Sequence, residues 1–172
     1  MRVSDLIWQR IAQEVDAAFY LSGGLAADLV DALGYSGIQA VCCLHEQGAG
    51  FAAVGYAQHR GFGVCLTTSG PGATNAMTPC LAAWMDSVPV LFISGNVMTN
   101  WFAYPGMRSR GTQEGKTIDM VKPITKAAFT AHDSADVLPL LNLLIDEAKH
   151  GRPGPVWLEV PQNVQAAKVE EK

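Results

Sequence analysis

The sequence predicts a doubly wound α/β domain, in which a mainly parallel six-stranded sheet carries helices on both faces as a three-layer sandwich. Three observations predict it. Strand-like apolar runs alternate with stretches of helical length along the chain. The strand-like runs are continuously apolar, which is typical of parallel strands covered on both faces. Hydrophobic residues make up 49% of the 172 residues and charged residues 16%, enough to bury one core of ordinary size.

The first half of the chain supplies three of the expected strands. Apolar residues at helical spacing predict an opening helix over residues 3–15, with Ser4 as its cap. Beyond it, glycines mark the ends of apolar runs and of helices. The expected order is strand 17–24, helix 25–34, strand 38–44, helix 46–61, strand 62–72 and helix 73–87.

The second half continues the alternation after one interruption. A strand is expected over residues 88–96, followed by an irregular polar segment over 98–117. A strand over 125–131, a helix over 134–151 and a strand over 154–161 complete the sheet. We therefore expect one domain over residues 1–165, and a polar tail or linker over residues 166–172.

Charge and hydropathy exclude several classes of partner. The net charge is −4, and the Lys and Arg residues are scattered, which argues against nucleic-acid binding. Every apolar run is too short to span a bilayer, and the N-terminus lacks the apolar core of a signal peptide. We expect a cytoplasmic protein that does not bind membranes.

The cysteines predict no metal site. Cys42, Cys43, Cys65 and Cys80 form no C-x-x-C pair, and the histidines are not at metal-ligand spacing. Three of the four lie in runs that resemble buried strands, so we expect inert core thiols.

Three features follow the ends of the first three predicted strands. Gly23 and Gly24 follow the first strand, Glu46 the second, and "SGPGATN" the third. Ligands of doubly wound sheets bind beyond the carboxyl ends of the strands. The sequence therefore predicts a ligand site where these three segments meet.

Glu46 is the candidate for chemistry at that edge. It stands between the apolar run "AVCCL" and the small-residue segment "QGAGFAA". A buried carboxyl is costly unless something uses it, and a partly buried one suits a proton-sharing role. The alternative is an ordinary glutamate at a helix start, favoured by the helix dipole.

The glycine-rich segments each allow two interpretations. The turn "TSGPGATN" could bind an anion on free N–H groups, or be a tight turn capped by Ser69 or Thr74. It matches neither the Walker A loop nor G-x-G-x-x-G. The helix over 46–61, rich in Gly and Ala, could pack closely on the sheet or admit a ligand or another subunit.

Several blocks of the sequence together resemble one family. "LHEQGAGFAAVGYA", "GVCLTTSGPGATNAMTPCLAAWMDSVPVLFISGNV", "MVKPITKAA" and "GRPGPVWLEVP" resemble thiamine-diphosphate enzymes of the acetolactate synthase type. The resemblance covers nearly the whole chain and is to the N-terminal pyrimidine-binding domain. It implies a part of a 2-oxo acid decarboxylase or carboligase, a transferase or lyase that is inactive as an isolated domain.

The resemblance also implies roles for individual residues. Glu46 would be the carboxyl that bonds to N1′ of the aminopyrimidine and so activates the cofactor. Gly23 and Gly24 would let the backbone approach that ring, and Pro71 and Asn75 would line its pocket. Gln113, in "GTQE", matches a glutamine that faces the reacting centre from the neighbouring subunit's loop.

Three positions depart from the family's pattern. Thr112 stands where the acetolactate synthases carry Phe, Leu25 where they carry Ala, and Gln162 where they carry Lys. These positions border the substrate pocket in the family. The resemblance therefore implies a small-molecule 2-oxo acid substrate, and the departures leave open whether its donor and acceptor are those of the acetolactate synthases or different ones.

The rest of the cofactor site is expected elsewhere. In the family, Mg²⁺ holds the diphosphate on a later domain with a G-D-G…N-N motif, which this sequence lacks. The resemblance also allows for FAD in the complete enzyme. The chain is then a domain of a longer enzyme or a separate subunit, and works in a homo-oligomer, at least a dimer, or with a partner chain. The alternatives are a non-catalytic binding module of the same fold and a generic nucleotide-binding domain.

Overall fold

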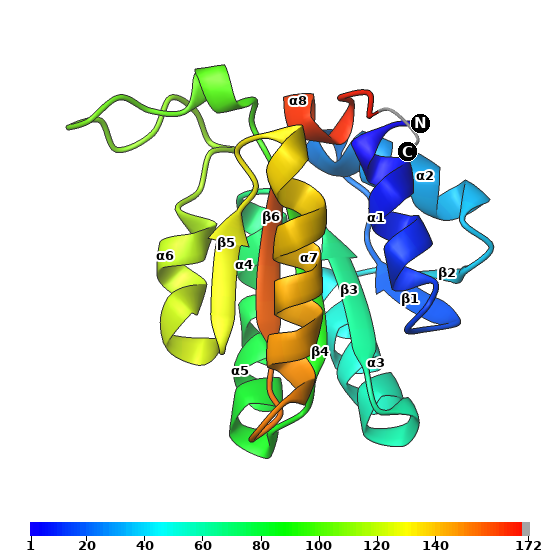
Figure 1. Cartoon of the computed structure of the whole chain (residues 1–172). Coiled ribbons are helices and arrows are strands. Elements are labelled where there is room, and N and C mark those ends of the chain that lie inside the picture. Colours follow the sequence, from blue (N-terminus) through cyan, green and yellow to red (C-terminus); the bar gives the residue numbers. More distant parts are fainter. Residues whose placement is uncertain (170–172) are drawn as a thin grey trace.

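The sheet has six strands, all parallel, in the order β2-β1-β3-β4-β6-β5 (Figure 1). The computed structural model describes residues 1–169. The predicted fold class is confirmed, although the strands are shorter than expected. Their bounds are β1 Ala17–Tyr20, β2 Gln39–Cys42, β3 Gly63–Thr67, β4 Val90–Asn96, β5 Ala127–Thr130 and β6 Val156–Pro161.

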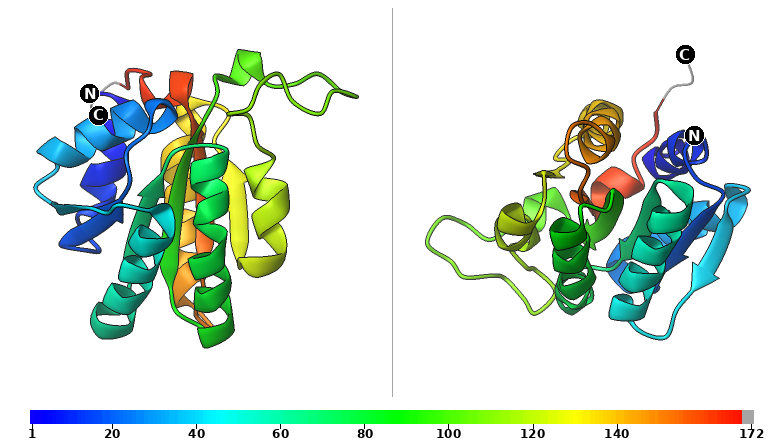
Figure 2. Two further views of the ribbon diagram at one scale, coloured as in Figure 1. Left: turned by 180° about the vertical axis from the view of Figure 1, so that it is seen from behind. Right: turned by 90° about the horizontal axis from the view of Figure 1, so that it is seen from below.

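Helices cover both faces of the sheet (Figures 1 and 2). One face carries α1 Val3–Ile11, α2 Ala27–Tyr35, α7 Ser134–Lys149 and α8 Gln162–Gln165. The other carries α3 Glu46–Arg60, α4 Pro71–Asn75, α5 Met77–Asp86 and α6 Thr117–Val121. Short 3-10 turns lie at η1 Gly24–Ala26, η2 Thr99–Trp101 and η3 Lys122–Ile124. No helix within residues 1–169 has the length and apolar character needed to cross a bilayer.

The central strands are apolar throughout because both of their faces are covered. In β3, Val64 and Leu66 pack in the core beneath α1 and α7, whereas Cys65 packs beneath α3 and α5. On the second face, the rings of Phe92 and Trp157 stack with centroids 5.2 Å apart. Trp157 Nε1 donates to Ser94 Oγ at 2.9 Å, so burial of the indole leaves no unpaired donor.

Small residues in α3 allow it to pack closely on its neighbours. A Cβ on Gly63 of β3 would lie 2.2 Å from the carbonyl oxygen of Ala53, and a Cβ on Gly50 would lie 2.3 Å from Pro79 of α5. Gly48 and Gly55 have open space beside them. Close packing therefore accounts for the inner face of α3, while the outer face stays free to meet another surface.

The opening helix is shorter than predicted and has a different cap. It ends at Ile11, because the chain then turns back toward β1 and buries Val15 by that turn. Ser4 is buried inside the helix. The N-cap residue is Arg2, whose backbone N–H donates to Asp5 at 2.8 Å in a capping box.

The predicted helix over residues 73–87 is two helices. The first begins at Pro71, where proline's fixed φ suits a first helical position, and the chain breaks at Ala76 before α5 begins. The N-cap is Gly70, at φ 54°, so neither predicted cap is correct. Thr74 Oγ1 donates to the Pro71 carbonyl at 3.0 Å, and Ser69 is buried.

The prediction of inert core thiols is half correct. Cys65 and Cys80 are buried, but Cys42 is exposed and Cys43 is half-buried. The reason is that β2 is an edge strand that pairs only with β1, so its apolar run is mostly uncovered. An apolar run alone does not distinguish an edge strand from a central one.

The two ends of the described chain lie together (Figure 2). Val3 N donates to the Ala167 carbonyl at 2.9 Å and Val169 N to the Met1 carbonyl at 3.0 Å. Residues 167–169, the start of the predicted tail, thus pair with the N-terminus, and residues 170–172 lie outside the described residues. The division into a domain and a linker stays a prediction.

Thiol accessibility gives a direct test of the edge-strand assignment. With a chromogenic disulfide reagent, Cys42 should react first in the native protein and Cys43 more slowly, because burial and the neighbouring Cys42 raise the pKa of Cys43. Burial also raises the pKa values of Cys65 and Cys80, which should react only after denaturation. Cys42→Ser should remove the fastest phase. One common rate for all four thiols would contradict the assignment.

Candidate functional site

The residues predicted to form a site gather at one edge of the sheet. All six strands are parallel, so their carboxyl ends meet at the upper edge in Figure 1. The glycine pair after β1, the start of α3 after β2, and the turn after β3 lie at that edge. The topology thus brings together segments that are far apart in the sequence.

Glu46 is buried at the start of α3 and is held by Asn75. The helix is capped by His45, whose Nδ1 accepts from Gln47 N at 3.1 Å. Glu46 is 9% exposed. Asn75, the last residue of α4, donates its Nδ2 to Glu46 Oε2 at 3.0 Å. Two of the predicted site residues are therefore in direct contact, through a neutral amide.

Gly23, Gly72 and Thr68 pack closely together beside the Glu46 carboxyl, and we call these three residues the glycine floor. A Cβ on Gly72 would lie 3.2 Å from Glu46 Oε1 and 2.7 Å from Thr68 Cγ2. A Cβ on Gly23 would lie 2.5 Å from Thr68 Cβ. Gly24, in contrast, has open space beside it and is exposed. Thr68 is a residue that the sequence reasoning missed; its place between a buried strand and the glycine turn was the available signal.

The glycine turn also supports the long loop over residues 98–116. Gly70 precedes the exposed Pro71, and a Cβ on Gly70 would lie 3.2 Å from the Gln113 carbonyl oxygen and 3.3 Å from the Thr112 carbonyl oxygen. Gln113 is exposed, and its backbone packs against Gly70 in the glycine turn of the same chain. The expected contact of its side chain with a neighbouring subunit's reacting centre stays a prediction.

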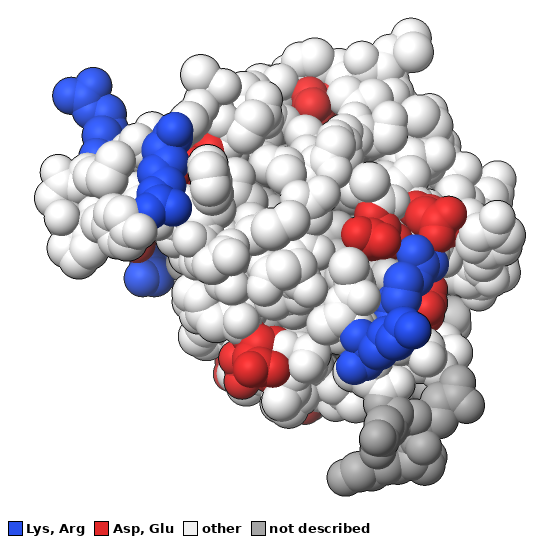
Figure 3. All heavy atoms as spheres, turned by 90° about the horizontal axis from the view of Figure 1, so that it is seen from above, with Lys and Arg blue, Asp and Glu red and all other residues white. Residues whose placement is uncertain are grey.

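The loop is held by contacts within itself. Glu114 accepts from the backbone N–H groups of Ala103 and Arg110, both at 2.6 Å. The Arg110 guanidinium lies 4.2 Å from the ring centroid of Tyr104 and 5.2 Å from that of Trp101. The loop projects from the body of the molecule and carries basic side chains on its surface (Figures 1 and 3).

Two of the three departures from the family pattern line one cavity. Leu25 and Gln162 share a space of about 320 Å³ with Val97, Met98 and Trp101. Its walls are mainly apolar. The cavity lies at the carboxyl edge, because these residues follow β1, β4 and β6.

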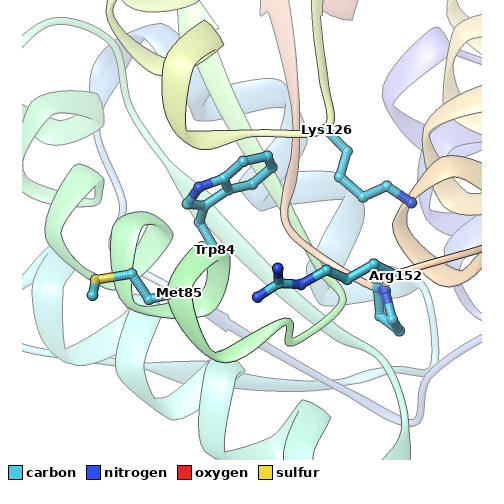
Figure 4. Close-up of a pocket in the computed structure, with 5 residues that line it drawn as sticks. Trp84, Met85, Lys126 and Arg152 are labelled. Atoms are coloured by element: carbon cyan, nitrogen blue, oxygen red, sulfur yellow. The ribbon is translucent and has the colours of Figure 1, made fainter.

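Another cavity lies at the opposite edge of the sheet. It has a volume of about 420 Å³ and is lined by Trp84, Met85, Lys126, Arg152 and Pro153 (Figure 4). These residues stand at the end of α5 and just before β5 and β6. None of the predicted site residues lines it, so this cavity is separate from the Glu46 site.

The described residues offer no metal centre. Within residues 1–169, no three His, Cys, Asp or Glu side chains are grouped so that they could hold a metal ion.

Comparison with known proteins shows which family the chain belongs to. Residues 1–120 match the family model described as "Thiamine pyrophosphate enzyme, N-terminal TPP binding domain". The chain belongs to this family. Thiamine pyrophosphate is the same compound as thiamine diphosphate, so the predicted resemblance is confirmed.

The relatives that the chain resembles are acetolactate synthases. It is 38% identical to the acetolactate synthase isozyme 2 large subunit of Escherichia coli (strain K12), over 91% of this chain and 28% of that protein. It is 38% identical to the acetolactate synthase large subunit of Lactococcus lactis subsp. lactis (strain IL1403), over 98% of this chain and 29% of that protein. It is 41% identical to the acetolactate synthase of Mycobacterium leprae (strain TN), over 88% of this chain and 24% of that protein.

The chain spans less than a third of the length of these relatives. The family model and these relatives together make the matched region a thiamine-diphosphate-binding N-terminal domain of the acetolactate synthase type.

The glycine floor predicts a sharp difference between two Gly→Ala variants. Gly72→Ala should lower the free energy of unfolding by about 1–3 kcal/mol, because the new methyl must displace Thr68 and Glu46. Gly48→Ala, at an open position of α3, should keep or raise stability by up to about 1 kcal/mol. Urea denaturation measures both. Equal stability of the two variants would show that the floor is not tightly packed.

Proposed function

We propose that this chain is the pyrimidine-binding part of a thiamine-diphosphate-dependent 2-oxo acid decarboxylase or carboligase, in which Glu46 activates the cofactor through N1′. The observation that carries the proposal is the buried Glu46 carboxyl, held on one oxygen by the neutral amide of Asn75. An enzyme of this type, working in the cytoplasm as a transferase or lyase, is consistent with the acetolactate synthases that the chain resembles.

The residues present fit an aminopyrimidine. Asn75 donates to Glu46 Oε2, and Oε1 lies beside Gly72, where an added Cβ would approach it to 3.2 Å. Oε1 would then be the oxygen that bonds to N1′. The open side of Gly24 lets a flat ligand approach the backbone, and Pro71 begins the helix that carries Asn75. A carboxyl in this position can share a proton with a ring nitrogen while the amide prevents it from rotating away.

Residues of this chain would hold the proton at N1′, and the cofactor would supply the chemistry of decarboxylation. Thiamine diphosphate, when bound, provides the electron sink that decarboxylation of a 2-oxo acid needs. Glu46 would hold the proton at N1′, and Gln113 would reach the substrate from the loop over residues 98–116. Both are expected to act in an oligomer, at least a dimer.

The substrate pocket should differ from that of acetolactate synthases. The cavity beside Leu25 and Gln162 is mainly apolar, and Gln162 replaces a cation with a neutral amide. We expect this cavity to accept an apolar group of the 2-oxo acid donor or of its acceptor.

The diphosphate end of the cofactor needs a partner domain. We expect Mg²⁺ on that domain, and FAD in the complete enzyme remains compatible with the family. The partner is a further domain of the same enzyme, repeated in a homo-oligomer, or a separate chain. The isolated chain should be inactive and should bind the cofactor weakly.

Exchange of the cofactor's C2 proton tests the role of Glu46. In the complete enzyme that contains this domain, Glu46→Gln should slow the exchange by at least about a hundredfold, since the amide cannot share a proton with N1′. Glu147→Gln, on the exposed surface of α7, is the matched control and should exchange normally. Normal exchange in Glu46→Gln with an intact fold would contradict the role and favour a non-catalytic binding module.

Calorimetry of the isolated chain tests the need for a partner. Thiamine diphosphate with Mg²⁺ should bind weakly, with a Kd above about 100 μM, because the pyrimidine contacts alone bury little of the ligand. Addition of the diphosphate-binding domain should tighten binding by at least about a hundredfold. Micromolar binding by the lone chain would refute this part of the proposal.

A further inference from the structure

A cavity with a mixed polar and apolar lining, at the carboxyl ends of β4, β5 and β6, takes no part in the function proposed above. Its volume is about 280 Å³. Asn96, Thr130 and Glu159 line it from the three strands, and the segment over residues 114–119 closes it from the other side. The opposite side of that segment faces the glycine turn, since a Cβ on Gly115 would lie 3.5 Å from Gly70 Cα. The cavity is thus close to the Glu46 site but behind the loop.

Two buried polar groups in this cavity lack partners. Glu159 is 3% exposed; its Oε2 accepts from Thr130 Oγ1 at 2.9 Å, but Oε1 has no hydrogen-bond partner. Thr117 is 1% exposed, and its Oγ1 likewise has no partner within hydrogen-bond geometry. Against burial, which raises the pKa of the Glu159 carboxyl, Asn96 and Thr117 lie close enough to that carboxyl to lower its pKa. Leaving a buried polar group unpaired is costly, so these two atoms can accept hydrogen bonds from a ligand.

The charges around the cavity select the kind of ligand. Glu114, Asp119 and Glu159 are acidic, and Lys116 is the one basic residue that lines it. Glu114 already accepts two backbone N–H groups, so Glu159 is the acid with a free acceptor inside. An anion is disfavoured there. The apolar side chains of Phe102 and Ile118 in the lining favour a cation with an organic body over a bare metal ion.

The apolar residues in the lining indicate that the body of the ligand, apart from its charged group, is apolar. Phe102 and Ile118 also line the cavity. We propose that this cavity binds a compact organic cation, an amidinium or ammonium group on an apolar body, which donates N–H bonds to Glu159 Oε1 and Thr117 Oγ1. Burial raises the pKa of Glu159, and a bound cation would offset the cost of ionising it. The site goes beyond the proposed function and does not require the cofactor.

Benzamidine is a suitable probe, and benzoate is its matched control of nearly the same shape and opposite charge. In ¹⁵N NMR spectra of this chain, benzamidine should shift the amide signals of Gly115, Thr117 and Thr130 saturably. Benzoate at the same concentrations should not. Shifts that do not saturate, or equal shifts with both compounds, would overturn the proposal and leave a cavity that holds water alone.

Two variants separate the ligand contacts from folding. Thr117→Val keeps the shape of the side chain but removes its hydroxyl, and should weaken benzamidine binding about tenfold. Glu159→Leu should abolish the saturable shifts, whereas Glu147→Leu on the surface of α7 should leave them unchanged. Unaltered affinity in Thr117→Val, if that variant keeps the native spectrum, would exclude the hydroxyl as a contact. Unaltered affinity in Glu159→Leu would refute the site.

Discussion

The hydrogen bond from Asn75 to Glu46 is the contact on which this site depends. It joins the end of α4 to the beginning of α3, and so fixes a buried carboxyl between two segments that follow different strands. Because the donor is a neutral amide, it positions the carboxyl without neutralising it as a cation would. Gly23 and Gly72 leave room for Thr68 beside this carboxyl, because a Cβ on either glycine would lie within 2.7 Å of the Thr68 side chain.

The sheet's topology explains why two polar sites lie at one edge. The carboxyl ends of β1, β2 and β3 place the Glu46 group, and those of β4, β5 and β6 place Glu159 and its neighbours. The loop over residues 98–116 crosses between them: it rests on Gly70 on one side, and its final residues close the second cavity on the other. Glu114 keeps this loop folded by accepting two of its backbone N–H groups.

The sequence predicted the layers of the fold and the convergence of Glu46 with Asn75, because continuous apolar runs and parallel topology leave few other arrangements. The prediction from sequence was wrong at positions whose structure depends on tertiary packing and not on the local sequence pattern. Val15 fits a helical spacing but is buried by a turn, and Cys42 lies in an apolar run that the edge position leaves uncovered. Glu159 carries no local signal and Thr68 only its place between a strand and a glycine turn, since the importance of both comes from residues that meet them in three dimensions. The family resemblance supplied the cofactor, which spacing alone did not.

The ¹⁵N chemical shift of N1′ in labelled thiamine diphosphate, bound to the complete enzyme, tests the central claim most directly. If Glu46 shares a proton with that nitrogen, the bound signal should move far from its position in the free cofactor and return toward it in Glu46→Gln. An N1′ signal that is the same free and bound, or that is unaffected by the substitution, would show that the carboxyl beneath the aminopyrimidine is not its proton partner.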